Sequence, residues 1–296
     1  MNNNKHTPSI IEDKYSNKKN SMTIYVQNKI INILTFILIF LFVIVIGFSL
    51  YKIVLWCFDN KNTSDAVDDI NDIALVNEVS DNDDTTLVSS VDDTNDPYWY
   101  YVKFPLISVN VNDLKKINTD IVGWINVNNT NVNYPFVHTD NNDFYLNHSI
   151  DKNYNEAGWL FLDYRNNVNL NDRNSIIYAH SRLDKSMFGS LSKVLKSSWY
   201  NDKDNHIIRT SSLTENSLWQ IFSVYRIKTE SYYITTYFED DNEYLEFLNT
   251  LKTRSIYDFN TNLSASDKIL TLSTCYSDTE RTVVHAKLIK KEIKKD

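Results

Sequence analysis

The sequence predicts a mainly β protein attached to one long N-terminal membrane helix. After residue 97, many short apolar runs follow one another, and few helical patterns interrupt them. That pattern is typical of a closed or nearly closed β-barrel. A single apolar run without any charge stands near the N-terminus, and it is long enough to span a bilayer. The 296 residues therefore suffice for one ordinary domain with appendages.

Charge and cysteine content exclude several classes of protein. The net charge of -8 argues against nucleic-acid binding as the main task. The two cysteines, Cys57 and Cys275, form no C-x-x-C pair, so we expect no structural zinc site and no other metal. A disulfide between them is an open alternative outside the cell. Trp56 precedes Cys57, whereas a lipoprotein anchor needs a small residue there, so we expect Cys57 to end a membrane helix.

The membrane segment is the run from Ile30 to Tyr51, which has 22 uncharged residues. At about 1.5 Å per residue it crosses a hydrocarbon core of about 30 Å. Trp56 lies just past it, where aromatic residues meet the membrane interface. Lysines before the run place the N-terminus in the cytoplasm. We therefore predict a cytoplasmic tail (1–29) and a single-pass anchor in the cell membrane (30–56); a cleaved signal peptide is the alternative, but the run is too long and lacks a small-residue cleavage site.

An acidic segment follows the predicted anchor. Residues 59–96 contain twelve acidic side chains and one lysine, and such a composition favours a solvated spacer. Ile70, Ile73, Ala74 and Val76 are spaced for one or two helical turns. We predict an extracellular stalk over residues 57–96 and an extracellular catalytic domain over residues 97–296.

Within the domain, local patterns predict one short N-terminal helix, several strands and one longer helix. Asn112 is a candidate cap for the short helix. Further strands are expected from Trp124 onward and over residues 131–136, 158–163, 175–179, 218–225 and 232–237. The longer helix is expected from Asp240 to Ser255, because Tyr244, Phe247, Leu248 and Leu251 share one helical face.

The stretch around Cys275 is the candidate active site. Residues 269–273 are short, apolar and β-prone, so they predict a buried strand that ends at Cys275. A second strand is expected over residues 282–289. Two antiparallel strands joined by residues 276–280 would bring Cys275 and Arg281 to the same rim. Nearby cations favour the nucleophilic thiolate, and a fixed guanidinium stabilises an oxyanion in acyl transfer.

His180 is the candidate acid or base, because it follows an apolar strand and precedes a polar run. Ser273 and Thr274 are weaker candidates for substrate binding through hydroxyl or backbone N–H groups. Each assignment has a structural alternative. Cys275 alone fits a small buried core residue, and Arg281 fits a surface salt bridge with Asp278 or Glu280. His285, inside the last strand, is read as structural or surface.

The motifs around these residues resemble the active-site signature of sortases, the cysteine transpeptidases of Gram-positive bacterial surfaces. Thr271-Leu272-Ser273-Thr274-Cys275 with Arg281 is similar to the cysteine motif, and Ile176-Ile177-Tyr178-Ala179-His180 is similar to the histidine strand. The class B subfamily is favoured by blocks that recur in the same order: Gly123-Trp124-Ile125, Tyr134-Pro135-Phe136-Val137, Asp143-Phe144-Tyr145-Leu146, Gly158-Trp159-Leu160-Phe161-Leu162-Asp163 and Ser186-Met187-Phe188. The resemblance extends from about Pro105 to the end.

The resemblance implies a sortase β-barrel of about eight strands, with a helix in the long connection before the cysteine strand. It also implies roles for three residues. Cys275 would attack the carbonyl of a threonine in a C-terminal sorting signal, His180 would transfer protons, and Arg281 would bind the substrate and oxyanion. The implied partners are surface proteins that bear the signal and a peptidoglycan cross-bridge amine. No cofactor is needed by this chemistry.

Three other functions remain open from the sequence. The first is a cysteine endopeptidase, in which water replaces the acceptor amine. The second is a pilin-polymerising sortase, whose acceptor would be a pilin lysine. The third is a non-catalytic surface adhesin on a membrane stalk, which the acidic spacer and the aromatic-rich domain permit.

Overall fold

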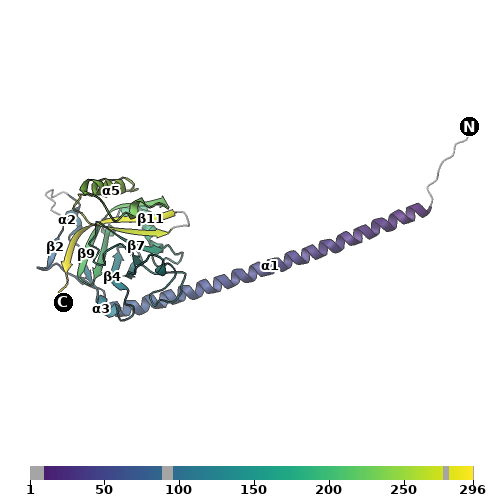
Figure 1. Ribbon diagram of the computed structural model, residues 1–296, viewed down its shortest axis with the longest axis horizontal. Coiled ribbons are helices and arrows are strands. Elements are labelled where there is room, and N and C mark those ends of the chain that lie inside the picture. Colours follow the sequence, from purple (N-terminus) through teal and green to yellow (C-terminus); the bar gives the residue numbers. More distant parts are fainter. Residues whose placement is uncertain (1–9, 89–95, 276–279, 296) are drawn as a thin grey trace, which may run out of the picture. The chain divides into compact units, whose positions relative to one another are not determined.

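The computed structural model describes residues 10–88, 96–275 and 280–295 (Figure 1). The chain divides into two compact units, residues 1–58 and residues 59–296. Helix α1 (Ile10–Ala74) begins in the first unit and ends in the second. It is the one helix among the described residues that is long and apolar enough to cross a membrane. Its apolar side chains from Ile30 to Tyr51 are exposed in the first unit, as expected of a candidate membrane span.

The second unit is a closed β-barrel, as the sequence predicted. Eight strands are joined in the order β10-β7-β6-β5-β4-β8-β9-β11, and a further pairing of β10 with β11 closes the ring. Strand β2 adds to the outer edge of β11, and β1 pairs separately with β3. The elements are α1 (Ile10–Ala74), β1 (Asn77–Val79), β2 (Thr85–Leu87), α2 (Tyr98–Tyr101), β3 (Leu106–Ser108), α3 (Val111–Leu114), β4 (Ile121–Val127), β5 (Asn133–Val137), η1 (Phe144–Leu146), β6 (Phe161–Leu162), β7 (Asn174–His180), η2 (Gly189–Leu195), α4 (Ser197–Tyr200), η3 (Lys203–Asn205), β8 (Ile207–Ser212), β9 (Glu215–Lys228), η4 (Tyr232–Ile234), α5 (Asp241–Thr253), β10 (Ile269–Cys275) and β11 (Glu280–Ile293).

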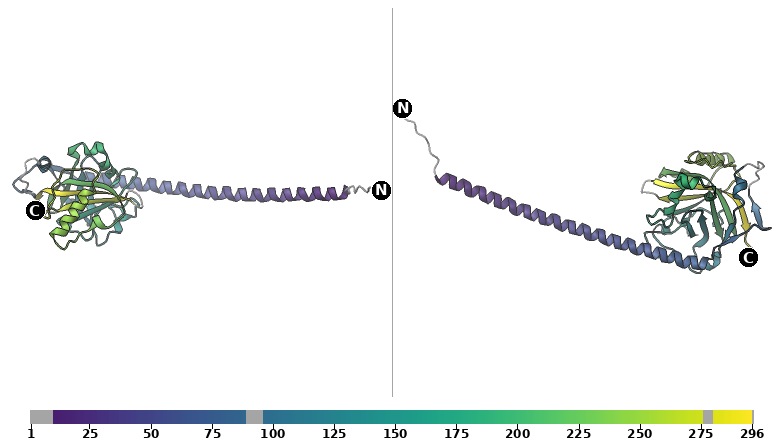
Figure 2. Two further views of the ribbon diagram at one scale, coloured as in Figure 1. Left: turned by 90° about the horizontal axis from the view of Figure 1, so that it is seen from above. Right: turned by 180° about the vertical axis from the view of Figure 1, so that it is seen from behind.

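The strands bury apolar side chains on both of their faces. Trp124, Phe136 and Leu272 belong to the largest core cluster, as expected for residues that fill a small barrel. Ile269 and Val283, from β10 and β11, belong to a second cluster beneath α5. The same strands therefore support the barrel interior and an outer layer, with α5 on the outside of the sheet (Figure 2).

Helix α5 is the helix predicted in the long connection before the cysteine strand. Asp240 caps it by accepting a hydrogen bond from the backbone N–H of Glu243. The four apolar residues that predicted its inner face are all buried: Tyr244, Phe247, Leu248 and Leu251. The helix thus covers β9, β10 and β11 from outside and forms, with η4, a lobe beside the sheet. We call residues 229–253 the outer lobe.

Two local predictions were wrong. Residues 232–237 do not form a strand, and Tyr232–Ile234 is a 3₁₀ turn. The reason is that Tyr233 is buried in the second cluster, beneath α5, and its backbone carbonyl accepts a hydrogen bond from the side chain of Asn174. Asn112 is not the cap of the short helix. Asn110 is the cap instead, and its side chain accepts a hydrogen bond from the backbone N–H of Asp113, so α3 begins one residue before Asn112.

The acidic segment before the barrel differs from the wholly solvated spacer expected from its composition. Ile70 and Ala74, at the end of α1, are buried in the main core cluster. Strand β2 pairs with β11, and Lys290 of β11 donates a hydrogen bond of 2.6 Å to Asp81. Lys290 on the last strand therefore balances part of the acidic charge of this segment, which composition alone did not reveal.

Candidate active site

The three predicted catalytic residues lie in one row across three adjacent strands. Cys275 is the last residue of β10; it pairs in parallel register with His180, the last residue of β7. On the other side it pairs in antiparallel register with Arg281 at the start of β11. Neighbouring strands lie about 4.8 Å apart. The backbone ladders therefore bring the three residues together at one end of the barrel.

A cleft of about 270 Å³ opens at this end of the barrel. His180 and Arg281 line it, together with the two weaker candidates Ser273 and Thr274. The remaining lining residues come from the barrel rim and the outer lobe: Asn142, Leu146, Phe161, Tyr178, Ala179, Thr229, Glu230, Tyr233 and Ile234. Aromatic and aliphatic walls with a few polar groups are typical of a site for an extended small substrate.

His180 is oriented by the backbone of Leu146, another residue that lines the cleft. Its Nε2 lies 2.7 Å from the carbonyl oxygen of Leu146. A carbonyl only accepts hydrogen bonds, so Nε2 carries the proton, and Nδ1 holds the lone pair in the neutral ring. A histidine fixed in this way can receive a proton at one defined atom.

Arg281 is half-buried at the other side of the row. Its guanidinium donates a hydrogen bond of 3.0 Å to the backbone carbonyl of Glu280, and the side chain lines the cleft. Asp278, the other acid considered as a salt-bridge partner, lies outside the described residues. An arginine at a cleft rim can donate hydrogen bonds to a carbonyl oxygen or an oxyanion.

Ser273 and Thr274 are both buried at the base of the cleft. The hydroxyl of Ser273 lies 3.0 Å from the hydroxyl of Tyr233 in the outer lobe. This contact joins the cysteine strand to the opposite wall of the cleft. Direct binding of substrate by Ser273 or Thr274 stays a prediction.

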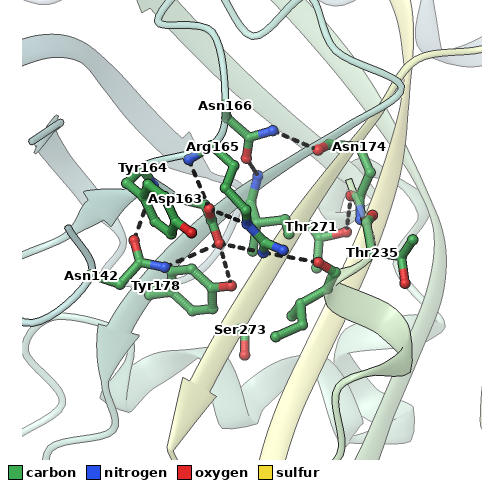
Figure 3. Close-up of polar contacts among 12 residues, drawn as sticks. Asn142, Asp163, Tyr164, Arg165, Asn166, Asn174, Tyr178, Thr235, Thr271 and Ser273 are labelled. Atoms are coloured by element: carbon green, nitrogen blue, oxygen red, sulfur yellow. Dashed lines mark hydrogen bonds and ion pairs between the residues drawn. The ribbon is translucent and has the colours of Figure 1, made fainter. Parts of the chain in front are cut away.

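A buried polar network that the sequence did not predict lies under one wall of the cleft (Figure 3). Its centre is Asp163, which follows β6 and has a fully buried side chain. Arg165, Tyr178 and Asn142 all donate hydrogen bonds to its carboxylate. Tyr178 lies two residues before His180 on the same strand, so the period-two alternation of a strand could have predicted that the two side chains share one face. Nothing local indicated that Asp163 and Asn142 would meet.

Charge in this network is balanced internally. Burial by itself raises the pKa of the Asp163 carboxyl, but hydrogen bonds from Arg165 and Tyr178 outweigh it, so the pKa lies below its usual value. Burial, with the nearby Asp163 charge, raises the pKa of Tyr178. Asp163 is therefore ionised and Tyr178 is a neutral hydroxyl donor at neutral pH. Among the described residues, no three His, Cys, Asp or Glu side chains gather as a metal site.

Comparisons with known proteins agree with the fold. The family model of the sortase domain matches residues 125–289. Sortase B of Listeria monocytogenes is 37% identical over 187 residues, which are 60% of this chain and 74% of that protein. A crystal structure of sortase B from B. anthracis superposes with a TM-score of 0.63 at 31% identity and covers 79% of this chain and 99% of that chain.

A Staphylococcus aureus sortase B–substrate complex superposes with a TM-score of 0.57 at 38% identity, over 61% of this chain and 84% of that chain. The closed eight-stranded barrel, the helix before the cysteine strand and these matches point to one conclusion: the chain belongs to the sortase family, with class B sortases as its relatives.

Proposed function

We propose that this chain is a membrane-anchored transpeptidase that joins surface proteins to a cell-wall amine. The observation that carries the proposal is the row of His180, Cys275 and Arg281 at the mouth of the cleft. The family and the substrate complex of a relative support it. The substrate is a C-terminal sorting signal that is cut after threonine.

The proposed reaction has two acyl transfers. The Cys275 thiolate attacks the threonine carbonyl carbon, and Arg281 stabilises the negative oxygen of the tetrahedral intermediate. The peptide bond then breaks, His180 protonates the leaving amine, and a thioester remains on the cysteine. An incoming amine attacks this thioester, His180 removes its proton, and the thiolate leaves. Water in place of the amine would make the enzyme an endopeptidase.

The proposed location follows from the apolar segment. Helix α1 would anchor the chain in the cell membrane through residues 30–56, with the lysine-containing tail in the cytoplasm. The catalytic unit would then face the cell wall, where both the sorting signal and a peptidoglycan cross-bridge amine are found. Residues 57–96 would connect the anchor to the barrel.

The first experiment compares the wild-type chain with Cys275→Ala on a panel of fluorogenic sorting peptides, with and without an added oligoglycine or diaminopimelate-type amine. We expect cleavage after threonine, an amine-joined product and complete loss in the variant. Acid product alone, with every amine tested, would favour the endopeptidase. No cleavage of any peptide, together with a Cys275 that resists alkylation in the folded protein, would overturn the enzymatic proposal.

A further inference from the structure

We propose that the Asp163–Arg165 ion pair is a positioning element that fixes the width of the substrate cleft, and so determines how tightly the sorting peptide binds. This inference rests on the proposed function. Neither residue lines the cleft. Both act through three lining residues, Asn142, Tyr178 and Ile234, which belong to three separate parts of the fold (Figure 3).

Asp163 holds the barrel side of the cleft. One carboxylate oxygen, Oδ2, accepts hydrogen bonds from the Tyr178 hydroxyl at 2.9 Å and from the Asn142 side-chain amide at 3.2 Å. Asn142 in turn accepts a hydrogen bond of 3.0 Å from the backbone N–H of Tyr164. Because the Asp163 side chain is fully buried, no water competes for these bonds. Two lining residues from different elements are thus held at one carboxylate.

Arg165 connects that carboxylate to the outer lobe. Its Nε and Nη2 bind the two oxygens of Asp163 at 2.8 and 2.7 Å, which is the bidentate geometry of a rigid pair. Nη2 also donates a hydrogen bond of 3.0 Å to the backbone carbonyl of Ile234. A planar guanidinium can make these contacts at once, whereas a lysine ammonium presents a single nitrogen.

The outer lobe has a second attachment that does not involve the ion pair. The side-chain amide of Asn174 donates hydrogen bonds to the backbone carbonyls of Tyr233 and Thr235, at 3.2 and 2.9 Å. This attachment keeps the turn on the barrel if Arg165 is changed. Loss of the Arg165 contact should therefore loosen the cleft wall without unfolding the lobe.

Loss of the contact between Arg165 and the Ile234 carbonyl should have a specific effect on the kinetics. A cleft with a loose wall binds the peptide less well, but His180 and Arg281 keep their places in the strand row. Arg165→Lys preserves a positive charge beside buried Asp163 and removes the bidentate geometry. We expect it to raise KM for the sorting peptide about tenfold, the size of one lost charge-assisted hydrogen bond, with kcat changed less than threefold.

Arg173→Lys is the matched control. Arg173 is 35% exposed, as is Arg165. It also binds a carboxylate, that of Asp241, and a backbone carbonyl, that of Asp240. However, neither partner lines the cleft. Because Asp241 is 73% exposed whereas Asp163 is fully buried, Arg173→Lys should lower the melting temperature less than Arg165→Lys does. It should leave KM within twofold.

The test measures peptide cleavage with full-length protein in mild detergent, together with melting temperature and hydrogen exchange over residues 229–238. We expect faster exchange in Arg165→Lys only. If Arg165→Lys keeps the KM and the hydrogen-exchange rate of the wild type, the ion pair supplies charge alone and the inference is wrong. An equal rise of KM in Arg165→Lys and Arg173→Lys would also overturn it. If wild-type protein cleaves no peptide and Cys275 also resists alkylation, the proposed function fails, but hydrogen exchange still decides whether the pair positions the wall.

Discussion

The buried histidine of the last strand predicts how the protein responds to acid. His285 is fully buried; its Nδ1 lies 2.8 Å from the Thr271 hydroxyl, and its Nε2 lies 2.8 Å from the Tyr225 hydroxyl. Thr271 gives its own hydrogen to the side-chain oxygen of Asn174. Its hydroxyl must therefore accept from Nδ1–H, and Nε2 accepts from Tyr225. The folded protein holds His285 in one neutral tautomer.

Burial, with a smaller contribution from the positive charge of Arg254, lowers the pKa of His285 from 6.5 to about 3. In the unfolded chain the ring takes up a proton below its ordinary pKa. The folded state therefore has full stability from this group above pH 6.5 and loses it as the pH falls toward 3. Below pH 6.5 the slope approaches about 1.4 kcal/mol per pH unit, so about 2.7 kcal/mol is lost between pH 8 and pH 4.5.

Urea unfolding at several pH values, followed by tryptophan fluorescence, measures this loss; Trp124, Trp159 and Trp219 are fully buried and report on the barrel. Acidic groups also titrate below pH 5, so the comparison is with His285→Gln. The variant should be less stable at pH 8, but its free energy of unfolding should fall by about 2.7 kcal/mol less on acidification to pH 4.5. Parallel curves for the two proteins would refute the argument that His285 is buried as a neutral ring.

Three further predictions concern the outer lobe, a strained turn and the strand row. Leu248→Ala should lower the free energy of unfolding by about 2–5 kcal/mol, because Leu248 is fully buried; half-buried Leu245 supplies the control, and equal losses would contradict the packing argument. Gly158→Ala should lower the free energy of unfolding by about 1–3 kcal/mol or more, because Gly158 has a φ of +59° and a Cβ would lie 2.5 Å from the Tyr145 carbonyl oxygen. Thermal unfolding tests this, and an unchanged melting temperature would contradict it. Under the proposed function, Arg281→Lys should lower kcat/KM by about 100-fold at an unchanged melting temperature, and wild-type kinetics would remove Arg281 from the mechanism.

Features that arise from short-range pattern were predictable from the sequence. The inner face of α5 follows from four apolar residues at helical spacing, and all four are buried. The pairing of Cys275 with Arg281 follows from two β-prone runs with a short connection between them. In both cases the residues that specify the structure lie within about two helical turns or one hairpin of each other.

Features that depend on distant partners were not predictable in this way. Residues 232–237 have the aromatic and β-branched composition of a strand. Their conformation is decided by Asn174 and Arg165, which lie about sixty and about seventy residues earlier in the chain. Both side chains bind the backbone carbonyls that a strand would use. The same reason hid β2, whose partner is the far end of β11.

The closure of the barrel has a consequence for how the protein is made. Strands β10 and β11 follow every other barrel strand in the chain, and their pairing with each other completes the ring. During synthesis the earlier strands leave the ribosome first, while β7 waits with an unpaired edge for a partner about ninety residues downstream. Long-range parallel pairing of this kind forms slowly. The last folding step therefore also assembles the row of His180, Cys275 and Arg281. An incompletely synthesised chain would hold no assembled row, so the candidate site forms only when the barrel is complete.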